Sequence, residues 1–377
     1  MVNLDKRVED MLTIELCELN IQVLESMDDW VRVIDANGRI IFLNKAMKES
    51  CNINSSVISC SFDEDTTFGD SVIPRSVSFI TLLTKKTYNQ EVIFMGKEYS
   101  VKSSPVLDEA GEVVAAVEVF RDISSEIHIR RELFNANKAM SDDIKFARSI
   151  QRQLLPEKGR VGDLVIDYYY KPSEQLSGDL FDVIRIDQDK VGIYICDVVG
   201  KGVGASILTM FIKQTMQAII SELGGANPST TLYELRARFG DMKLEENLYF
   251  TMMYGVYSKK DRTFSYSNAG HNCSPILKLD DDYKVLEITG VPICDLFKEM
   301  TYKEDVVRLE KGDQLVFYTD GFTESMSYER EEFGHERFVE AIMMPGDIIE
   351  NVVTKVNRFS WGEVFDDMAI MVATLVE

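Results

Sequence analysis

The sequence predicts an α+β protein with two domains that are joined by a long helix. Its 377 residues are enough for two or three domains of roughly 100–200 residues each. Strand-like segments fill residues 20–121, a glycine-free helical stretch covers residues 122–155, and strands and helices follow in groups over residues 156–377. Because the helices of this last part lie between hairpins and not in strict strand–helix–strand order, we expect layered antiparallel sheets there.

Composition and charge exclude some classes of partner. A hydrophobic content of 45% and a charged content of 28% indicate a folded protein. The net charge of −22 argues against nucleic acids and anionic membranes as partners, and it suits protein partners and bound cations. No apolar run approaches the ~18–20 residues that span a bilayer, and the acidic start of the chain does not resemble a signal peptide. The six cysteines show no Cys-x-x-Cys spacing, so we interpret them as reduced thiols of a cytoplasmic protein.

The N-terminal region reads as a helix followed by an antiparallel sheet. Residues 1–19 have a helical pattern. Residues 30–44 predict a hairpin, because two apolar strands flank an Asp-Ala-Asn-Gly turn. A second hairpin is expected at residues 91–106 and a last strand at residues 113–123, whereas residues 50–75 are too rich in Ser, Asn and Asp to assign.

This order of elements over residues 20–121 resembles a PAS sensory domain. The resemblance depends on the Val-Ile-Asp-Ala-Asn-Gly-Arg-Ile-Ile-Phe-Leu-Asn segment at 33–44 and on the closing strands. It implies a sheet that holds haem, flavin or a small ligand, or that only contacts other proteins. Residues 20–124 contain no histidine and no flavin-binding cysteine motif, so a His-ligated haem is not expected and the ligand is unknown. We interpret Cys51 and Cys60 as buried packing residues.

Residues 122–155 predict a connecting helix that ends at Pro156. Apolar residues recur every three or four positions in its second half, and those of its first half follow a different register. We interpret it as a short coiled coil with a register break, through which the protein forms a homodimer. The alternative, a helix packed on one of its own domains, remains open.

The most informative stretch lies at residues 190–220. A buried, β-rich run ends at an aspartate, a glycine loop follows, and a helical pattern begins. The loop, Gly200-Lys-Gly-Val-Gly204, has the spacing of neither a P-loop nor a dinucleotide fingerprint. Cys196, inside the strand, is predicted to pack rather than to act as a nucleophile. His271 is interpreted as a general acid or as a structural residue, and Lys201 as a phosphate contact or as a solvated side chain.

Four acidic loci share one pattern, a carboxylate at the edge of a predicted strand. They are Asp179, Asp197, Asp320 and the pair Asp366 and Asp367. A single aspartate at such a place is usually a turn or cap residue. Four of them supply hard oxygen ligands that suit Mg²⁺ or Mn²⁺, and two such ions would activate a water molecule and hold a phosphoryl oxygen.

The same residues resemble the SpoIIE-type branch of the PPM metal-dependent serine/threonine phosphatases. The motifs are Ile-Gln-Arg-Gln-Leu-Leu-Pro at 150–156, Leu-Ser-Gly-Asp-Leu-Phe-Asp at 176–182, Cys-Asp-Val-Val-Gly-Lys-Gly-Val-Gly-Ala at 196–205, Ser-Asn-Ala-Gly-His-Asn at 267–272, Tyr-Thr-Asp-Gly-Phe-Thr-Glu at 318–324 and Asp-Asp-Met at 366–368. They span residues 150–377 in the family's order, with Ser177 where the family usually has glycine. The resemblance implies an αββα sandwich with a dinuclear Mg²⁺ or Mn²⁺ centre between the sheets.

The resemblance also implies a set of site residues. The metal ligands are Asp179, Asp197, the Val198 carbonyl, Asp320 and Asp366, with Asp367 as the alternative to Asp366, and the four aspartates other than Asp367 form the catalytic set. Asp197 would bridge both ions, and Asp179 would bind directly or through water. Asp366 is favoured over Asp367 because the family's acidic pair uses its first member. Activated water would attack phosphorus without a covalent enzyme intermediate.

The resemblances together imply a PAS-regulated protein-serine/threonine phosphatase. Its substrate would be a phosphorylated anti-sigma-factor antagonist in a bacterial partner-switching pathway. A diguanylate cyclase is one alternative, because Ser-Gly-Asp-Leu-Phe at 177–181 is similar to Gly-Gly-Asp-Glu-Phe, but the glutamate is missing. A non-catalytic scaffold is the other, and the intact acidic loci argue against it.

Overall fold

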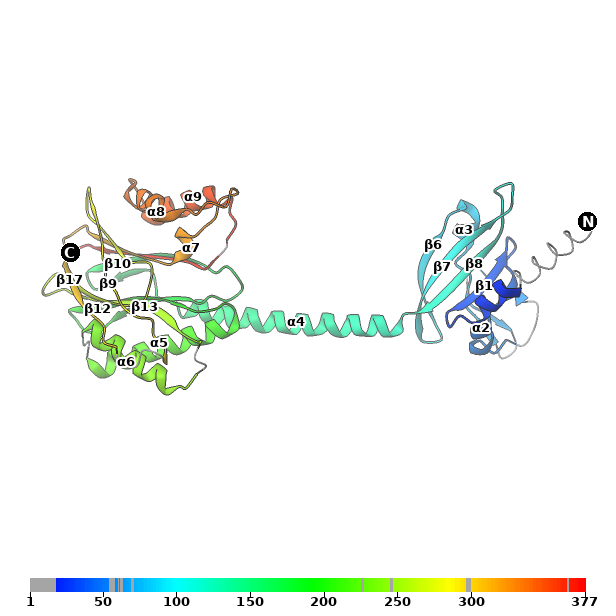
Figure 1. Cartoon of the computed structure of the whole chain (residues 1–377), viewed down its shortest axis with the longest axis horizontal. Coiled ribbons are helices and arrows are strands. Elements are labelled where there is room, and N and C mark those ends of the chain that lie inside the picture. Colours follow the sequence, from blue (N-terminus) through cyan, green and yellow to red (C-terminus); the bar gives the residue numbers. More distant parts are fainter. Residues whose placement is uncertain are drawn as a thin grey trace, which may run out of the picture. The chain divides into compact units, whose positions relative to one another are not determined.

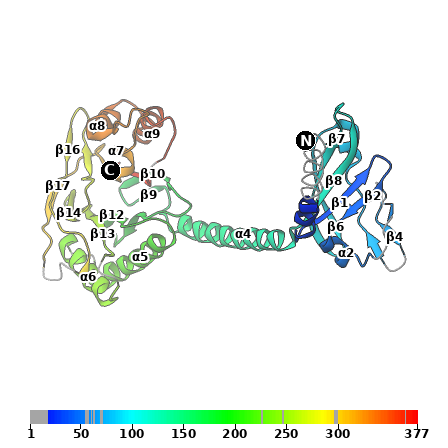
Figure 2. The ribbon, with the colours of Figure 1, turned by 45° about the vertical axis from the view of Figure 1, so that its right-hand side comes forward.

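The computed structural model describes residues 18–53, 58–59, 61, 64–68, 71–224, 227–244, 247–295, 300–364 and 366–377. The chain divides into two compact units, residues 1–138 and 139–377, each with its own core (Figures 1 and 2). The helix expected at residues 1–19 lies outside the described residues except for its last two positions, which belong to a helix over residues 18–25.

The N-terminal unit is built on a six-stranded antiparallel sheet with the strand order β3-β2-β1-β8-β7-β6 (Figure 2). Its strands are β1 (Trp30–Asp35), β2 (Arg39–Leu43), β3 (Ile58–Ser59), β6 (Tyr88–Phe94), β7 (Lys97–Leu107) and β8 (Val113–Asp122). Both predicted hairpins are confirmed, because β1 pairs with β2 and β6 pairs with β7. At the first turn the Asp35 carboxylate accepts hydrogen bonds from the N–H groups of Asn37 and Arg39, and Gly38 has a φ of 80°.

Short elements complete the described part of this unit. They are α2 (Lys45–Ser50), β4 (Thr66–Phe68), β5 (Ser71–Ile73) and α3 (Phe79–Thr84). The two strands lie in the segment that the sequence pattern left unassigned. Asn44 caps α2, because its side-chain oxygen accepts the N–H of Met47. Cys51 is buried, as predicted, and burial raises the pKa of its thiol to about 11; Cys60 lies outside the described residues.

A buried ion pair joins two strands of this sheet. Arg32 on β1 and Glu118 on β8 lie opposite each other, are both fully buried and share a hydrogen bond. Glu118 also accepts hydrogen bonds from the hydroxyl groups of Ser76 and Ser78 and from the N–H of Val77, at 2.6–2.8 Å. Its charge is therefore compensated by one cation and several donors, as a buried carboxylate requires.

The connecting helix is α4 (Ser124–Gln153), which ends just before Pro156 as the sequence predicts. Five of its large apolar side chains are more than half exposed: Ile129, Leu133, Phe134, Met140 and Phe146. Near its start Arg131 forms an ion pair with Glu98, and near its end Gln151 is buried. The coiled coil and the homodimer remain predictions, which the exposed apolar residues motivate.

Two antiparallel sheets form the centre of the C-terminal unit. The strands of the larger sheet, in spatial order, are β16 (Tyr283–Val285), β15 (Ile276–Lys278), β18 (Gln314–Tyr318), β19 (Met368–Leu375), β10 (Leu164–Lys171) and β9 (Gly159–Val161). Those of the smaller sheet are β11 (Asp179–Arg185), β12 (Lys190–Val198), β13 (Phe250–Ser258), β14 (Thr263–Ala269) and β17 (Asp305–Arg308). Side chains of both sheets share one core, in which Phe264 of one sheet contacts Phe317 of the other.

Helices cover the outer faces of both sheets. They are α5 (Val203–Leu223), α6 (Pro228–Asp241), α8 (Gly334–Met343) and α9 (Ile348–Phe359), with the single turn α7 (Asp320–Thr323) after β18. Apolar residues of α5 and α6 pack on the smaller sheet, and those of α8 and α9 pack on the larger one, so the layers run helix–sheet–sheet–helix (Figure 1). The predicted layered antiparallel fold is confirmed, whereas α7, β9 and β16 were not predicted.

A helix that crosses a membrane needs about 18–20 predominantly apolar residues. By length and composition α5 meets that requirement. It does so without the uninterrupted apolar run that the sequence was expected to lack, because small and hydroxyl residues are mixed into its apolar pattern. Half of its most apolar window is buried inside the unit, where Ile212 and Met216 belong to the core against the smaller sheet.

Candidate metal centre

The first two predicted carboxylates face each other on neighbouring strands. The register sets Asp179 on β11 opposite Asp197 on β12. Asp179 is the first residue of its strand and not part of the preceding loop, because the N–H of Val198 bonds to the Gly178 carbonyl and extends the pairing. The Val198 carbonyl, a predicted ligand, lies so close to Gly178 that an added Cβ would approach its oxygen to 2.9 Å. Glycine is therefore required beside this oxygen.

The other two loci meet at one edge of the larger sheet. Asp320 opens α7 directly after β18, and Asp366 and Asp367 lie just before β19, which pairs with β18. The Thr319 hydroxyl joins the segments, because it donates to the Asp367 carbonyl at 3.3 Å and accepts the N–H of the second residue of β19 at 3.0 Å. A Cβ on Gly321 would lie 2.0 Å from the same carbonyl oxygen, so only glycine permits this approach.

Hydrogen bonds join the loci of the two sheets, because the Ser177 hydroxyl and the N–H of the next residue donate to Asp367 at 2.7 and 2.8 Å. Burial raises the pKa of Asp179 well above its ordinary value, and the charges of Asp197 and Asp367 raise it further. Burial also raises the pKa of Asp197 to about 7, with contributions from Asp320, Asp366 and Asp367. Such interactions act over short distances, so the sandwich gathers acids from both sheets at one place.

This group of acids fits a divalent cation. Oδ2 of Asp179 is buried and has no hydrogen-bond partner among the described residues, which leaves a polar atom uncompensated. Carboxylate oxygens are the donors that Mg²⁺ and Mn²⁺ prefer, and a cation would neutralise the mutual repulsion. Within the described chain no three acidic, histidine or cysteine side chains already form a finished ligand set.

The two adjacent aspartates have different surroundings. Asp367 accepts four hydrogen bonds of 2.7–2.8 Å. The donors are the N–H and hydroxyl of Ser173, the hydroxyl of Ser177 and the N–H of Gly178. Both of its oxygens are thereby used. The Asp366 side chain is 40% exposed and forms an ion pair with Lys201 at 3.0 Å. Asp366 is therefore the more accessible of the two carboxylates.

The end of α4 holds the loop before Asp179. Nε2 of Gln151 donates to the Ser177 carbonyl at 2.8 Å, and its Oε1 accepts the Ser177 N–H at 3.2 Å. The Ser177 hydroxyl in turn donates to Asp367 and accepts the N–H of Asp179 at 3.0 Å. Sequence reasoning gave neither residue a role. The position of Gln151 in the 150–156 motif and the departure from glycine at Ser177 were the available signals.

The surroundings of two further residues favour one of the roles considered for each. His271 is buried, with Nε2 3.3 Å from the Tyr318 carbonyl and Nδ1 3.0 Å from the Thr251 hydroxyl. Nε2 therefore donates to the carbonyl and Nδ1 accepts, while burial lowers the pKa of the ring to about 4. A neutral ring whose nitrogens are both hydrogen-bonded favours the structural role of His271 over that of a general acid. Cys196 is fully buried and burial raises the pKa of its thiol, so it packs, as predicted.

Two residues that were not predicted border the centre. The Asn272 amide donates to Oδ2 of Asp320 at 3.1 Å and orients that carboxylate. The pKa of Glu324 is raised by burial and then by Asp320, Glu332 and Asp366. Glu324 therefore lies between the acids of the centre and Glu332 of the loop over residues 325–333.

Comparisons with known proteins show which family the chain is similar to. The family model of Stage II sporulation protein E (SpoIIE) matches residues 187–376, half of the chain. The chain is 27% identical over 241 residues to the phosphoserine phosphatase RsbU of Bacillus subtilis (strain 168), covering 62% of this chain and 70% of RsbU. It is 30% identical over 184 residues to the phosphoserine phosphatase RsbP of the same strain, covering 48% of this chain but only 44% of RsbP.

Solved structures share the fold. The SiaA-PP2C domain of Pseudomonas aeruginosa matches with a TM-score of 0.55 and 20% identity, covering 63% of this chain and 98% of that domain. The PP2C phosphatase domain of SpoIIE from Bacillus subtilis, with a fragment of its regulatory domain, matches with a TM-score of 0.50 and 12% identity, covering 87% and 85%. The C-terminal unit has the PP2C-type fold, and with the match of the family model over half of the chain, this protein belongs to the SpoIIE family.

Proposed function

We propose that the protein is a metal-dependent phosphatase that removes phosphate from phosphoserine or phosphothreonine in another protein. The observation that carries the proposal is the buried group of acids from two sheets, with an uncompensated oxygen on Asp179. Membership of the SpoIIE family and the similarity to two phosphoserine phosphatases support it.

Asp179, Asp197, Asp320 and Asp366, with the Val198 carbonyl, would hold two Mn²⁺ or Mg²⁺ ions. Such ions, when bound, activate water and neutralise charge on the phosphoryl oxygens. The chain itself positions the carboxylates: the β11–β12 register aligns the first pair, and neighbouring side chains orient the others.

Asp367 serves as a positioning residue in this proposal. It binds Ser173 and Ser177 and so fixes the loop that leads into β11. Lys201 places a cation beside Asp366, at a part of the centre that is accessible to solvent. A phosphate monoester carries negative charge, so this ammonium group favours its approach once Asp366 has turned toward an ion.

The N-terminal unit is proposed to be a PAS sensory domain of unknown ligand, and α4 to be the coiled coil of a homodimer in the cytoplasm. The six-stranded antiparallel sheet of this unit and the exposed apolar residues of α4 support these assignments. Gln151 gives α4 a direct connection to the loop beside the metal centre. A change in α4 would then alter the position of Asp179 and Asp367. The proposed substrate is a phosphorylated anti-sigma-factor antagonist, on the strength of the family resemblance.

The two alternatives are less well supported. In the cyclase reading the Ser-Gly-Asp-Leu-Phe segment would form a nucleotide site, yet Asp179 pairs with Asp197 in a PP2C-type sheet. The scaffold reading gives no reason for acids that raise one another's pKa values in a buried place.

Hydrolysis of a synthetic phosphoserine peptide by the purified full-length chain tests the proposal. We expect phosphate release with added Mn²⁺ or Mg²⁺ and none in excess EDTA. A parallel incubation with GTP should yield no cyclic dinucleotide. Phosphate release that is equally fast in EDTA would contradict a metal-dependent mechanism, and a dinucleotide product would favour the cyclase.

A further inference from the structure

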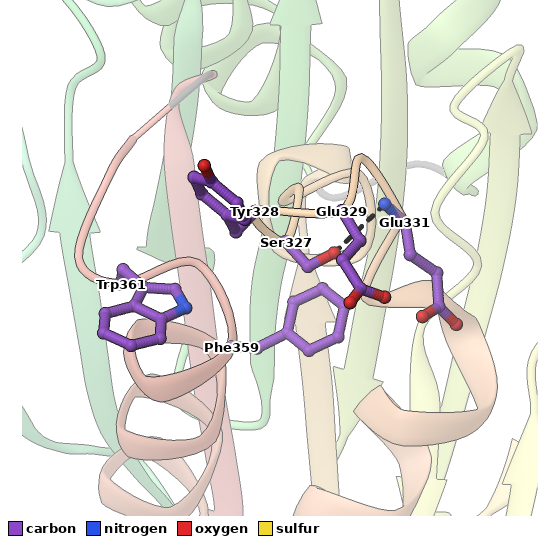
Figure 3. A pocket seen from close by; sticks show the side chains of 6 residues that line it. All are labelled: Ser327, Tyr328, Glu329, Glu331, Phe359 and Trp361. Carbon is purple, nitrogen blue, oxygen red and sulfur yellow. Dashed lines mark hydrogen bonds between the residues drawn. The ribbon is translucent and has the colours of Figure 1, made fainter.

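A hollow of about 660 Å³ lies in the C-terminal unit between the loop over residues 325–333 and the end of α9. It is lined by Ser327, Tyr328, Glu329, Glu331, Phe359 and Trp361, and we name it the aromatic–acidic pocket (Figure 3). In this view the rings of Tyr328 and Trp361 lie to one side of Phe359, and the carboxylates of Glu329 and Glu331 lie to the other. None of these residues belongs to the metal centre.

Two large aromatic side chains of this pocket are left in solvent. Tyr328 is 91% exposed and Trp361 is 81% exposed. Within the described part of the chain neither side chain has a hydrogen bond or an aromatic partner. Phe359, by contrast, packs against Phe333 and lies under the guanidinium group of Arg337. The fold thus anchors the floor of the pocket and leaves its rings available, which is typical of a surface that binds a partner.

The loop that carries Tyr328 and Glu329 is held in place by its own bonds. The N–H of Ser327 bonds to the Glu331 carbonyl at 2.8 Å, and the N–H of Arg330 bonds to the Ser327 carbonyl at 2.9 Å. The Ser327 hydroxyl accepts the N–H of Glu331 at 3.1 Å. Glu331 is further fixed by an ion pair with Arg337. A pocket that is already ordered loses little conformational entropy when it binds.

The pocket adjoins the metal centre through the chain on both sides. The Ser325 hydroxyl donates to the Gly321 carbonyl at 2.7 Å, which ties the start of the loop to the residue after Asp320. Trp361 lies five residues before Asp366 in the sequence. Because the loop that lines the pocket is bonded to the turn that carries Asp320, the residues that flank a phosphoserine at the centre can extend toward this pocket.

The chemistry of the lining selects a cation. Aromatic rings attract guanidinium and ammonium groups, and a neighbouring carboxylate pairs with them. Glu331 already binds Arg337, so Glu329 is the carboxylate that remains for a partner. The net charge of −22 also favours a cationic segment at the surface. We propose that the aromatic–acidic pocket docks the protein substrate by an arginine or lysine side chain that flanks its phosphoserine.

This inference rests on the proposed function, and its test separates the two. The probes are phosphoserine peptides of one length that carry Arg, Ala or Glu at a series of offsets from the phosphoserine. With Mn²⁺ present, we expect one offset at which wild type hydrolyses the Arg peptide with a kcat/KM about ten-fold above that of the Glu peptide. The difference should arise from a lower KM for the Arg peptide and not from a higher kcat. Trp361→Ala and Glu329→Gln should each reduce this preference to less than two-fold. Hydrolysis of p-nitrophenyl phosphate should not change in these variants.

A matched control is Tyr283→Ala, which removes another partly exposed aromatic residue and should retain the preference. A second readout needs no hydrolysis. In EDTA the Arg peptide should change the tryptophan fluorescence of wild type, and Trp361→Phe, which leaves only the buried Trp30, should show no change. A protein that is inert toward every phosphate ester but shows this fluorescence change would refute the phosphatase and retain the docking site.

Three results would overturn the docking proposal. One is a preference for Arg that survives in Trp361→Ala. Another is the absence of both a preference at every offset and a fluorescence change in wild type. The third is self-association that depends on Trp361 in sedimentation, which would make a second copy of the chain the occupant.

Discussion

Replacing Gln151 by alanine tests whether the end of α4 supports the metal centre. Its side chain is 2% exposed and bonds both the N–H and the carbonyl of Ser177. Alanine would leave these two backbone groups buried without partners, at a cost of about 1–3 kcal/mol each. We therefore expect the free energy of unfolding of the C-terminal unit to fall by about 2–6 kcal/mol. Urea unfolding followed by circular dichroism measures this loss.

The same variant should bind metal more weakly. The Ser177 hydroxyl bonds Asp367 and the N–H of Asp179, so a looser loop disturbs both acids. A loss of about 1.4 kcal/mol at the centre corresponds to a ten-fold rise in Kd. We expect at least that rise for Mn²⁺ by calorimetry, and recovery of turnover at saturating Mn²⁺.

Gln153→Ala is the matched control, since this glutamine is the last residue of α4 but is exposed. It should leave stability and Mn²⁺ affinity unchanged. Wild-type stability and affinity in Gln151→Ala, or equal behaviour of the two variants, would refute the argument that α4 supports the centre through this side chain.

Three more predictions concern the acids and the helix. Asp366→Asn should abolish metal-dependent hydrolysis with little change in Tm. Asp367→Asn, which disturbs four hydrogen bonds, should lower Tm and retain more activity. The reverse order of activities would overturn the ligand assignment. In EDTA, Asp197 should destabilise the folded state as pH rises from about 4 to 7, because burial and its acidic neighbours raise its pKa from 3.8 to about 7. Urea unfolding should thus find Asp197→Asn more stable than wild type at pH 8 but not at pH 4, and identical pH profiles would contradict this. One residue inserted after Asn137 turns the rest of α4 by about 100° and should change the basal rate of phosphate release strongly, whereas seven inserted residues should change it little. Equal rates for both insertions, or a monomer by sedimentation, would make α4 a passive tether.

The positions of the candidate ligands could be predicted because each lies beside a recognisable strand. An apolar run that stops at an acid is visible in the sequence at Asp197 and Asp320. Antiparallel pairing of β11 with β12 and of β18 with β19 then places the acids of each sheet side by side. Local patterns of this kind depend only on strand periodicity, which tertiary contacts rarely override when the strand is buried on both faces.

The supporting contacts could not be predicted, because they join segments that are far apart in the chain. The Ser177 hydroxyl meets Asp367 across 190 positions, and Gln151 meets Ser177 across 26. In the N-terminal unit Arg32 and Glu118 lie on strands, and the alternation of side chains along a strand does not tell whether they face the core or the solvent. Only the three-dimensional fold shows that both are buried. Trp361 is the opposite case, since a tryptophan is expected to be buried and this one is 81% exposed.

The most direct test of the central claim is to measure bound Mn²⁺ and phosphate release in the same samples of wild type and Asp197→Asn. The claim is that acids from both sheets form one dinuclear centre that hydrolyses phosphoserine. We expect two Mn²⁺ per chain and steady release of phosphate from a phosphoserine peptide for wild type, but at most one Mn²⁺ and no release for a folded Asp197→Asn. Two bound ions and wild-type turnover in that variant would contradict the account.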